Sequence, residues 1–227
     1  MCGRFTLGIQ ESMLADWFDI HDERVEVIPR YNIAPTQEIP VVKSDGNRNT
    51  VTLMRWGLVP FFSKDGKSKY PMINARAETV ETNNAYKGPF KSKRCLIPVD
   101  GFYEWKKLDA KTKQPMRILL KSEEPFAFAG IWEWWRPKET PEAEDILSCS
   151  IITTVANSLI EPIHDRMPVI LPPDLYSDWM NPTNQDIGEL KEYLLPYDSG
   201  LMKAYLVSPL VNSVKNQGQE LIGEVAR

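Results

Sequence analysis

Six short apolar runs, separated by turn residues, restrict this chain to a fold built mainly from strands. Turn signals such as Asp45-Gly46 and Asp100-Gly101 punctuate the runs, as in antiparallel sheets with tight connections. Strands and helices do not alternate strictly along the chain, so the pattern favours an α+β fold over a parallel βαβ fold. The runs are residues 39–42, 50–54, 95–99, 116–120, 126–131 and 149–154.

Helices are expected at the periphery of an antiparallel, partly closed sheet. Met13, Leu14 and Trp17 would lie on one side of the first helix, and Pro173 would begin the third. The polar stretch at residues 135–145 is interpreted as an exposed loop between two strands. The chain has 227 residues and is 42% hydrophobic, which suffices for one core and predicts a single domain over residues 1–227. The expected helices are residues 12–17, 78–83, 173–179 and 186–195.

Charge is distributed unevenly, although the net charge is only −4. Residues 61–121 hold fourteen Lys and Arg against six Asp and Glu, which makes this segment +8 and the rest −12. Such a segment is either a basic face for a polyanion or a solvated surface. Aromatic residues lie within or beside it, as single-stranded nucleic acid binding requires, although core packing explains most aromatics. These aromatics are Trp56, Phe61, Phe62, Tyr70, Tyr86 and Phe90.

Other features of the composition limit cofactor and compartment. No apolar run approaches the ~18 residues of a membrane helix, and the first residues lack the apolar core of a signal peptide. Three cysteines without a CxxC pair argue against a disulfide scaffold or a thiolate zinc site, and two histidines cannot form a His-rich metal site. We therefore expect a cytoplasmic protein with no metal, no organic cofactor and no membrane partner.

Cys2 carries the most chemical information. A side chain this small at position 2 normally permits removal of Met1, which would leave cysteine as the first residue. Its α-amine would have a pKa of about 7.7–8.0 and its thiol a pKa of about 8.5, so both groups are partly in their nucleophilic forms near neutral pH. Such a 1,2-aminothiol condenses with an aldehyde to an imine and then closes to a thiazolidine ring. The alternative is an incidental cysteine at a frayed terminus, although Gly3 would permit a close approach to a ligand.

Two internal segments hold groups that could assist such chemistry. Asn74 lies at an expected strand end and could orient a nucleophile or a sugar, while Arg76 offers a planar fork for phosphate. Glu104 stands between Tyr103 and Trp105, and desolvation by these rings would raise its pKa and suit it to proton transfer. The alternatives are a turn with a surface ion pair and a glutamate that faces water.

His164 is the better of the two candidate imidazoles. Asp165 adjoins it and Arg166 follows, which places an acid–base group beside a potential anion clamp. A structural histidine is the alternative. His21 lies in an acidic run and is expected at the surface.

An ordered set of motifs across nearly the whole chain resembles the SOS response-associated peptidase, or SRAP, family. Each motif is weak by itself, whereas the ordered set is highly specific. They are MCGRF at residues 1–5, RYNIAP at 30–35, RWGLVP at 55–60, INARAE at 73–78, CLIP at 95–98, GFYEW at 101–105, IHDRMP at 163–168 and VKN at 214–216.

The resemblance implies a compact, mainly antiparallel, barrel-like fold with flanking helices. It also implies a DNA-damage protein that senses abasic sites in single-stranded DNA and crosslinks to them through a thiazolidine, shielding the lesion. By position, Cys2 matches the nucleophile, Asn74 the residue that positions the sugar, Glu104 the acid–base group and His164 the residue that opens the sugar ring and reverses the crosslink. The matching DNA-binding positions are Arg4, Arg76 and Arg166 for phosphate, with Trp56, Phe61 and Phe62 for stacking or wedging.

The family name further implies a peptidase that exposes Cys2 by self-processing, for which methionine aminopeptidase is a sufficient alternative. The protein is expected to be monomeric and to reach the nucleoid during DNA damage. Two other functions stay open. One is an N-terminal-nucleophile amidotransferase, in which Cys2 hydrolyses glutamine. The other is a DNA-binding module that holds single strands without a covalent bond.

Overall fold

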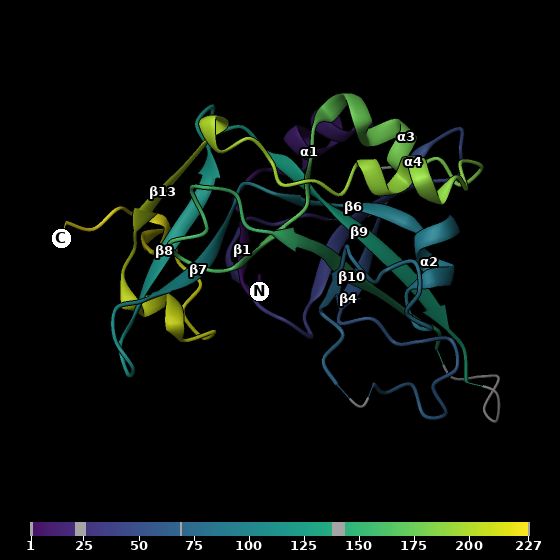
Figure 1. Cartoon of the computed structure of the whole chain (residues 1–227), viewed down its shortest axis with the longest axis horizontal. Helices are drawn as coiled ribbons and strands as arrows, with labels where there is room; N and C mark the ends of the chain where they lie inside the picture. The colour runs from purple at the N-terminus through teal and green to yellow at the C-terminus, as the bar shows by residue number, and fades with distance from the viewer. Residues whose placement is uncertain (1, 21–25, 69, 138–143, 227) are drawn as a thin grey trace.

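Apolar and β-branched runs form two sheets in the computed structural model, which describes residues 2–20, 26–68, 70–137 and 144–226 (Figure 1). The α+β class expected from the sequence is confirmed, and all six expected strands are present with longer bounds. His21 lies outside the described residues, as do Met1 and the middle of the 135–145 loop. No helix among the described residues is long and apolar enough to cross a membrane.

The smaller sheet has five strands in the order β13-β8-β7-β1-β2, and it contains the beginning of the chain. Every pairing within it is antiparallel. Asp100, in the turn before β7, accepts hydrogen bonds from the Thr6 hydroxyl and from the Gly8 backbone N–H at 2.9 Å, which holds the middle of the short β1 and the residue after it. The strands are β1 (Phe5–Leu7), β2 (Arg30–Ile33), β7 (Gly101–Lys107), β8 (Lys113–Leu120) and β13 (Met202–Leu206).

The larger sheet closes on itself as a ring, because β10 pairs with both β4 and β9. The ring is not a true barrel, because two of its contacts between strands are very short. The parallel contact of β10 with β4 has two residue pairs, and the antiparallel contact of β3 with β6 has one. A second parallel pairing joins β5 to β10. The strands are β3 (Glu38–Ser44), β4 (Asn49–Trp56), β5 (Asn74–Arg76), β6 (Arg94–Val99), β9 (Phe126–Trp135), β10 (Ile146–Val155), β11 (Arg166–Pro168) and β12 (Ile170–Leu171).

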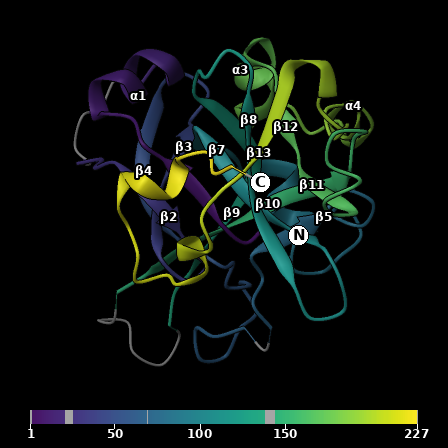
Figure 2. The same ribbon diagram turned by 90° about the vertical axis from the view of Figure 1, so that its left-hand side faces the viewer.

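Aromatic side chains join the two sheets. The Phe5 ring lies 5.1 Å from that of Trp56 and 6.1 Å from that of Phe128, and Phe102 lies 5.6 Å from Phe128. All four rings are fully buried. Because Phe5 and Phe102 belong to one sheet and Trp56 and Phe128 to the other, burial of these rings holds the sheets together. Figure 1 shows β7, β8 and β13 of the smaller sheet to the left of β9 and β10 of the larger sheet, and Figure 2 views the molecule from the side of the smaller sheet.

Three of the four expected helices are confirmed and one is wrong. Residues 78–83 form successive turns, since the short polar side chains there compete for the backbone: Asn83 Oδ1 accepts from the Ala85 N–H at 2.9 Å. The helix begins later, at α2, where Pro89 is tolerated in the first turn. The helices are α1 (Glu11–Phe18), α2 (Lys87–Ser92), α3 (Tyr176–Met180), preceded by the 3₁₀ turn η1 (Pro173–Leu175), and α4 (Ile187–Glu192).

Candidate functional site

The segment before β1 runs alongside β7, which brings the second residue of the chain to an acidic side chain. In the β1–β7 pairing Phe5 is opposite Phe102, and the Tyr103 N–H donates to the Arg4 carbonyl at 2.9 Å. Continuing this antiparallel register places Gly3 opposite Glu104. Cys2 therefore lies next to the strand position that carries Glu104.

Cys2 is fully buried and held by its backbone. Its carbonyl accepts a hydrogen bond of 2.9 Å from Asn74 Nδ2, and its Sγ lies 3.9 Å from the Arg4 carbonyl oxygen. Burial, with a further contribution from the charge of Glu104, raises the pKa of the Cys2 thiol. Among the described residues Asn74 Oδ1 is buried without a hydrogen-bond partner, so an acceptor beside Cys2 is available to a bound molecule.

Glu104 is 3% exposed, and desolvation by burial raises its pKa to about 7. The predicted cause was wrong in one respect. Side chains alternate along β7, so Tyr103 and Trp105 point to the opposite face, where they join a separate apolar cluster with Val207, Val211 and Leu221. Glu104 instead shares its face with Phe102 of the main core. A carboxyl with this pKa can give or take a proton near neutral pH.

His164 lies at the end of a turn, two residues before β11 begins at Arg166. The Arg166 backbone N–H donates to Nδ1 at 3.0 Å, and burial lowers the pKa of His164. The neutral ring therefore carries its proton on Nε2. Asp165 Oδ1 is 2.9 Å from the same Nδ1, ready to pair with it if the ring is protonated. The charge of Asp165 also contributes to the raised pKa of Glu104, so this turn lies within electrostatic range of the Cys2 site.

Strand β10 brings two of the predicted phosphate-binding arginines together. Thr153 of β10 pairs with Arg76 of β5 on one side and with Pro168 of β11 on the other. Arg76 is exposed and shares a strand face with Asn74. The Arg166 guanidinium forms a two-pronged pair with Glu78 and donates to the Thr153 carbonyl at 2.6 Å.

Two predicted DNA-binding residues lie elsewhere. Trp56 is fully buried, and its Nε1 donates to the Ile73 carbonyl at 2.9 Å, so it has no free face for a base. Arg4 extends toward the face of β7 that carries Trp105, away from Glu104, where its Nη1 donates to Asn32 Oδ1 at 2.6 Å. Its guanidinium thus binds the protein itself in this structure.

Phe61 and Phe62 have the exposure that a wedge needs. They are 59% and 53% exposed, and their rings meet edge to face with centroids 5.2 Å apart. Sequence reasoning did not anticipate two contacts of the site. Tyr86 donates its hydroxyl to the Asn74 carbonyl at 3.2 Å, and Asn32 binds Arg4. The signal for Asn32 was present in the RYNIAP motif, but nothing in the sequence indicated its contacts.

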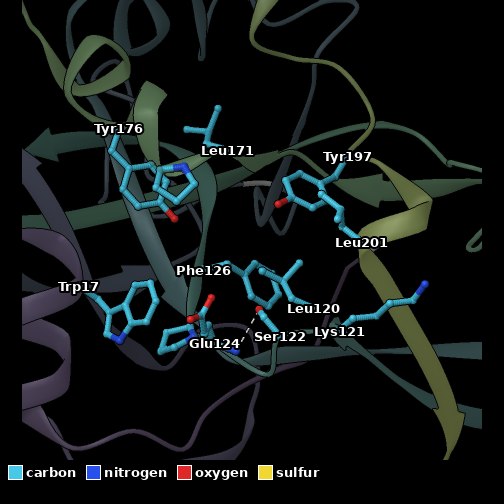
Figure 3. Close-up of a pocket in the computed structure, with 12 residues that line it drawn as sticks. Trp17, Leu120, Lys121, Ser122, Glu124, Phe126, Leu171, Tyr176, Tyr197 and Leu201 are labelled. Carbon is cyan, nitrogen blue, oxygen red and sulfur yellow. Dashed lines mark hydrogen bonds between the residues drawn. The ribbon is translucent and has the colours of Figure 1, made fainter.

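A separate cavity of about 240 Å³ lies away from these residues. Figure 3 shows the rings of Trp17, Phe126, Tyr176 and Tyr197 around it. None of the site residues predicted from the sequence lines this cavity. Within the described part of the chain, no group of three His, Cys, Asp or Glu side chains is arranged as metal ligands would be.

Replacing Glu104 with glutamine should stabilise the protein at pH 8 and leave it unchanged at pH 4. The folded-state pKa of about 7 exceeds the ordinary 4.5, so the wild type loses stability as the pH rises from 4.5 through 7. The difference corresponds to about 3 kcal/mol of unfolding free energy at pH 8. Urea unfolding of both proteins at each pH measures it, with the exposed Glu161→Gln as a matched control. A Glu104→Gln variant less stable than wild type at pH 8 would contradict the raised pKa.

Comparisons with known proteins show which family and which relatives the chain resembles. A family model described as SOS response associated peptidase (SRAP) matches residues 1–214. The abasic site processing protein YoqW of Bacillus subtilis is 50% identical over 224 residues, covering 98% of this chain and 99% of YoqW. The abasic site processing protein YedK of Escherichia coli is 33% identical over 239 residues, covering 99% and 100%. A crystal structure of a Bacteroides thetaiotaomicron protein superposes with a TM-score of 0.87 at 27% identity, covering 99% and 100%. The chain belongs to the SOS response associated peptidase (SRAP) family.

Proposed function

We propose that this protein processes abasic sites in single-stranded DNA by forming a thiazolidine crosslink through Cys2 once Met1 has been removed. The observation that carries the proposal is that Cys2 is buried and held by Asn74 beside Glu104, where an incidental residue at a chain end would fray. Relatives named abasic site processing proteins, at up to 50% identity over 98% of the chain, support the choice of DNA lesion.

The crosslink forms in two steps with loss of one water. The Cys2 amine adds to C1′ of the ring-opened deoxyribose, and the carbinolamine expels water to give an imine. The thiol then gives its proton to the Glu104 carboxylate and adds its sulfur to the carbon of the protonated imine, which closes the ring and leaves the ring nitrogen neutral. Because burial raises the pKa of the thiol, the amine is the better first nucleophile. The positive charge of a protonated imine would then favour loss of the thiol proton.

Three side chains have roles that match their surroundings. Glu104, with a pKa of about 7, donates the proton that carries off water and accepts the thiol proton. Asn74 holds the Cys2 carbonyl, and its Oδ1 is an acceptor for an amine or sugar hydroxyl. His164, neutral with a proton on Nε2, acts on the sugar oxygen during ring opening and during reversal of the crosslink.

Binding of the strand precedes the chemistry. Exposed Arg76 is suited to bind one phosphate of the DNA backbone. Arg166 would give up one of its contacts with Glu78 and bind a second phosphate. Phe61 and Phe62 offer the exposed rings on which bases stack or which wedge apart a strand. Trp56 and Arg4 are not part of this surface in our proposal, since one is buried in the core and the other binds Asn32.

Exposure of the Cys2 amine is a prerequisite, and we propose that either self-processing or methionine aminopeptidase provides it. The protein would act as a monomer on one strand end, at the nucleoid within the cytoplasm. No cofactor is needed, since aldehyde and aminothiol supply every atom of the product.

A denaturing gel tests the covalent step directly. The processed protein, with Cys2 shown by mass spectrometry to be the first residue, should give a heat-stable shifted band with a single-stranded oligonucleotide carrying one abasic site. An intact strand should give none, because it has no aldehyde. Cys2→Ser, also processed, keeps the amine but loses the thiol, so we expect a band only when borohydride reduces the imine. No band for the wild type, or a heat-stable Cys2→Ser band without borohydride, contradicts the mechanism.

The pH dependence of crosslinking should report Glu104. The required free amine accumulates as pH rises through about 7.7–8.0, while protonated Glu104 declines as pH rises through its pKa of about 7. The rate at saturating DNA should therefore be bell-shaped, with its maximum between pH 7 and 8. In Glu104→Gln the fall at high pH should disappear and the rate should drop about a hundredfold or more. If the rate of Glu104→Gln still falls at high pH, the group that titrates there is not Glu104.

Two aromatic substitutions separate a binding residue from a core residue. Phe61→Ala should weaken binding to a strand with a non-reactive tetrahydrofuran abasic analogue by about 1–3 kcal/mol, because stacking on its exposed ring is lost. Trp56→Phe should leave that affinity unchanged and lower unfolding free energy by about 1–3 kcal/mol, because the Ile73 carbonyl loses its donor. Fluorescence anisotropy and urea unfolding measure the two effects. Weaker DNA binding by Trp56→Phe together with unchanged binding by Phe61→Ala would refute the assignment of Phe61 to the DNA surface and of Trp56 to the core.

A further inference from the structure

Two of the family motifs, at residues 30–35 and 214–216, have no role in the proposed chemistry, yet they meet in the structure. Asn32 of β2 is fully buried, and its Nδ2 faces three backbone carbonyls of the C-terminal segment. These belong to Val211 at 3.3 Å, Ser213 at 3.0 Å and Asn216 at 2.8 Å. We call residues 208–217 the C-terminal strap.

The strap is attached from several directions. Gln217 Nε2 donates to the Asn32 carbonyl at 3.1 Å, and Trp105 Nε1 donates to Asn212 Oδ1 at 2.7 Å. Val211 is fully buried in the apolar cluster that contains Tyr103. The Nδ2 of buried Asn32 thus holds a turn of the strap, while its Oδ1 stays available as an acceptor for another group.

That acceptor binds Arg4, two residues from the proposed nucleophile. Arg4 Nη1 donates to Asn32 Oδ1 at 2.6 Å and to the Val211 carbonyl at 2.9 Å, and its guanidinium lies 5.8 Å from the centre of the Trp105 ring. Arg4, Asn32 and Val211 therefore form a closed set of contacts. A buried amide with its donor and acceptor both engaged has a defined orientation, so the contacts restrict Arg4 to one position.

Restricting Arg4 also restricts Cys2. The Arg4 carbonyl receives the Tyr103 N–H and lies 3.9 Å from Cys2 Sγ, while β1 itself begins only at Phe5. The opposite face of β7 carries Glu104, so the strap does not touch the reacting groups. It acts on them through the backbone between Arg4 and Cys2. A crosslinking reaction depends steeply on the placement of the nucleophile, because misplacement by about 1 Å can cost a hundredfold in rate.

We propose that Asn32 is a positioning residue, which locks the C-terminal strap onto Arg4 and thereby holds Cys2 in register with Glu104. The inference rests on the proposed function for its effect on crosslinking, whereas its effect on Cys2 itself is independent of DNA. The strap is far from Cys2 in the sequence, so residues distant along the chain help to position the amino-terminal segment through Arg4.

Crosslinking kinetics of Asn32→Ala test the proposal against a matched control. Asn49→Ala removes another amide that donates to a backbone carbonyl, that of Phe18 at 3.1 Å, between β4 and α1 and away from the site. We expect Asn32→Ala to lower the crosslinking rate at saturating abasic DNA at least about tenfold while its affinity for the tetrahydrofuran analogue stays within about twofold. Asn49→Ala should keep the wild-type rate. An equal loss of rate in both variants, or a loss of affinity that accounts for the slower rate, would overturn the positioning role.

Thiol alkylation separates this proposal from the proposed function. Iodoacetamide labelling, resolved by mass spectrometry, should modify Cys2 at least about tenfold faster in Asn32→Ala than in the wild type, because the strap no longer holds the segment. Buried Cys95 and Cys149 report global opening and should stay protected. If the wild type fails to crosslink DNA, the proposed function fails, and the labelling still decides the role of the strap. Unchanged Cys2 labelling, or a parallel rise at all three cysteines, would overturn it.

Discussion

Burial of the Phe5 ring between the two sheets is the interaction on which the rest of the site depends. Phe5 contacts Trp56 and Phe128 from a strand of only three residues, with Asp100 binding the backbone and hydroxyl groups around it. So short a strand has few ladder hydrogen bonds, and apolar burial supplies most of its attachment. The chain end that would otherwise fray is thereby fixed at residue 5. Everything proposed for Cys2 follows from this anchor, since the residues before β1 continue along β7 toward Glu104.

Much of the sheet structure could be predicted because its strands are apolar or alternate in polarity, which is a local property of the sequence. The misses have tertiary causes. Strands β1, β5 and β11 have three residues each, too few for a period to be visible, and each is formed by pairing with a longer partner. The closing of the ring through β10 is likewise invisible in the sequence, since it joins residue 149 to residue 56 in parallel. Residues 78–83 show the opposite failure, because the helix expected there is prevented by local Asx bonding.

The site residues divide in the same way. Cys2 and Glu104 are recognisable by their chemistry, but the reason for the raised pKa of Glu104 depends on which face of β7 it occupies. Trp56 and Arg4 have side chains suited to DNA, yet the fold uses one for the core and the other for the strap. Side-chain type alone does not distinguish these uses. Asn32 is the clearest case, because its contacts with Val211, Ser213 and Asn216 span about 180 positions of the chain.

Burial connects the stability of this site with its chemistry. The same desolvation that raises the pKa of Glu104 to about 7 also keeps the Cys2 thiol protonated, so near neutral pH Glu104 exchanges a proton while the adjacent thiol stays uncharged. In the proposed reaction, protonated Glu104 is the proton donor for imine formation, and a protonated Cys2 thiol does not react before that imine exists. In our proposal, this arrangement therefore orders the steps through electrostatics. Its cost is a carboxyl that destabilises the fold when ionised, which is the exchange of stability for reactivity expected where a protein carries out chemistry.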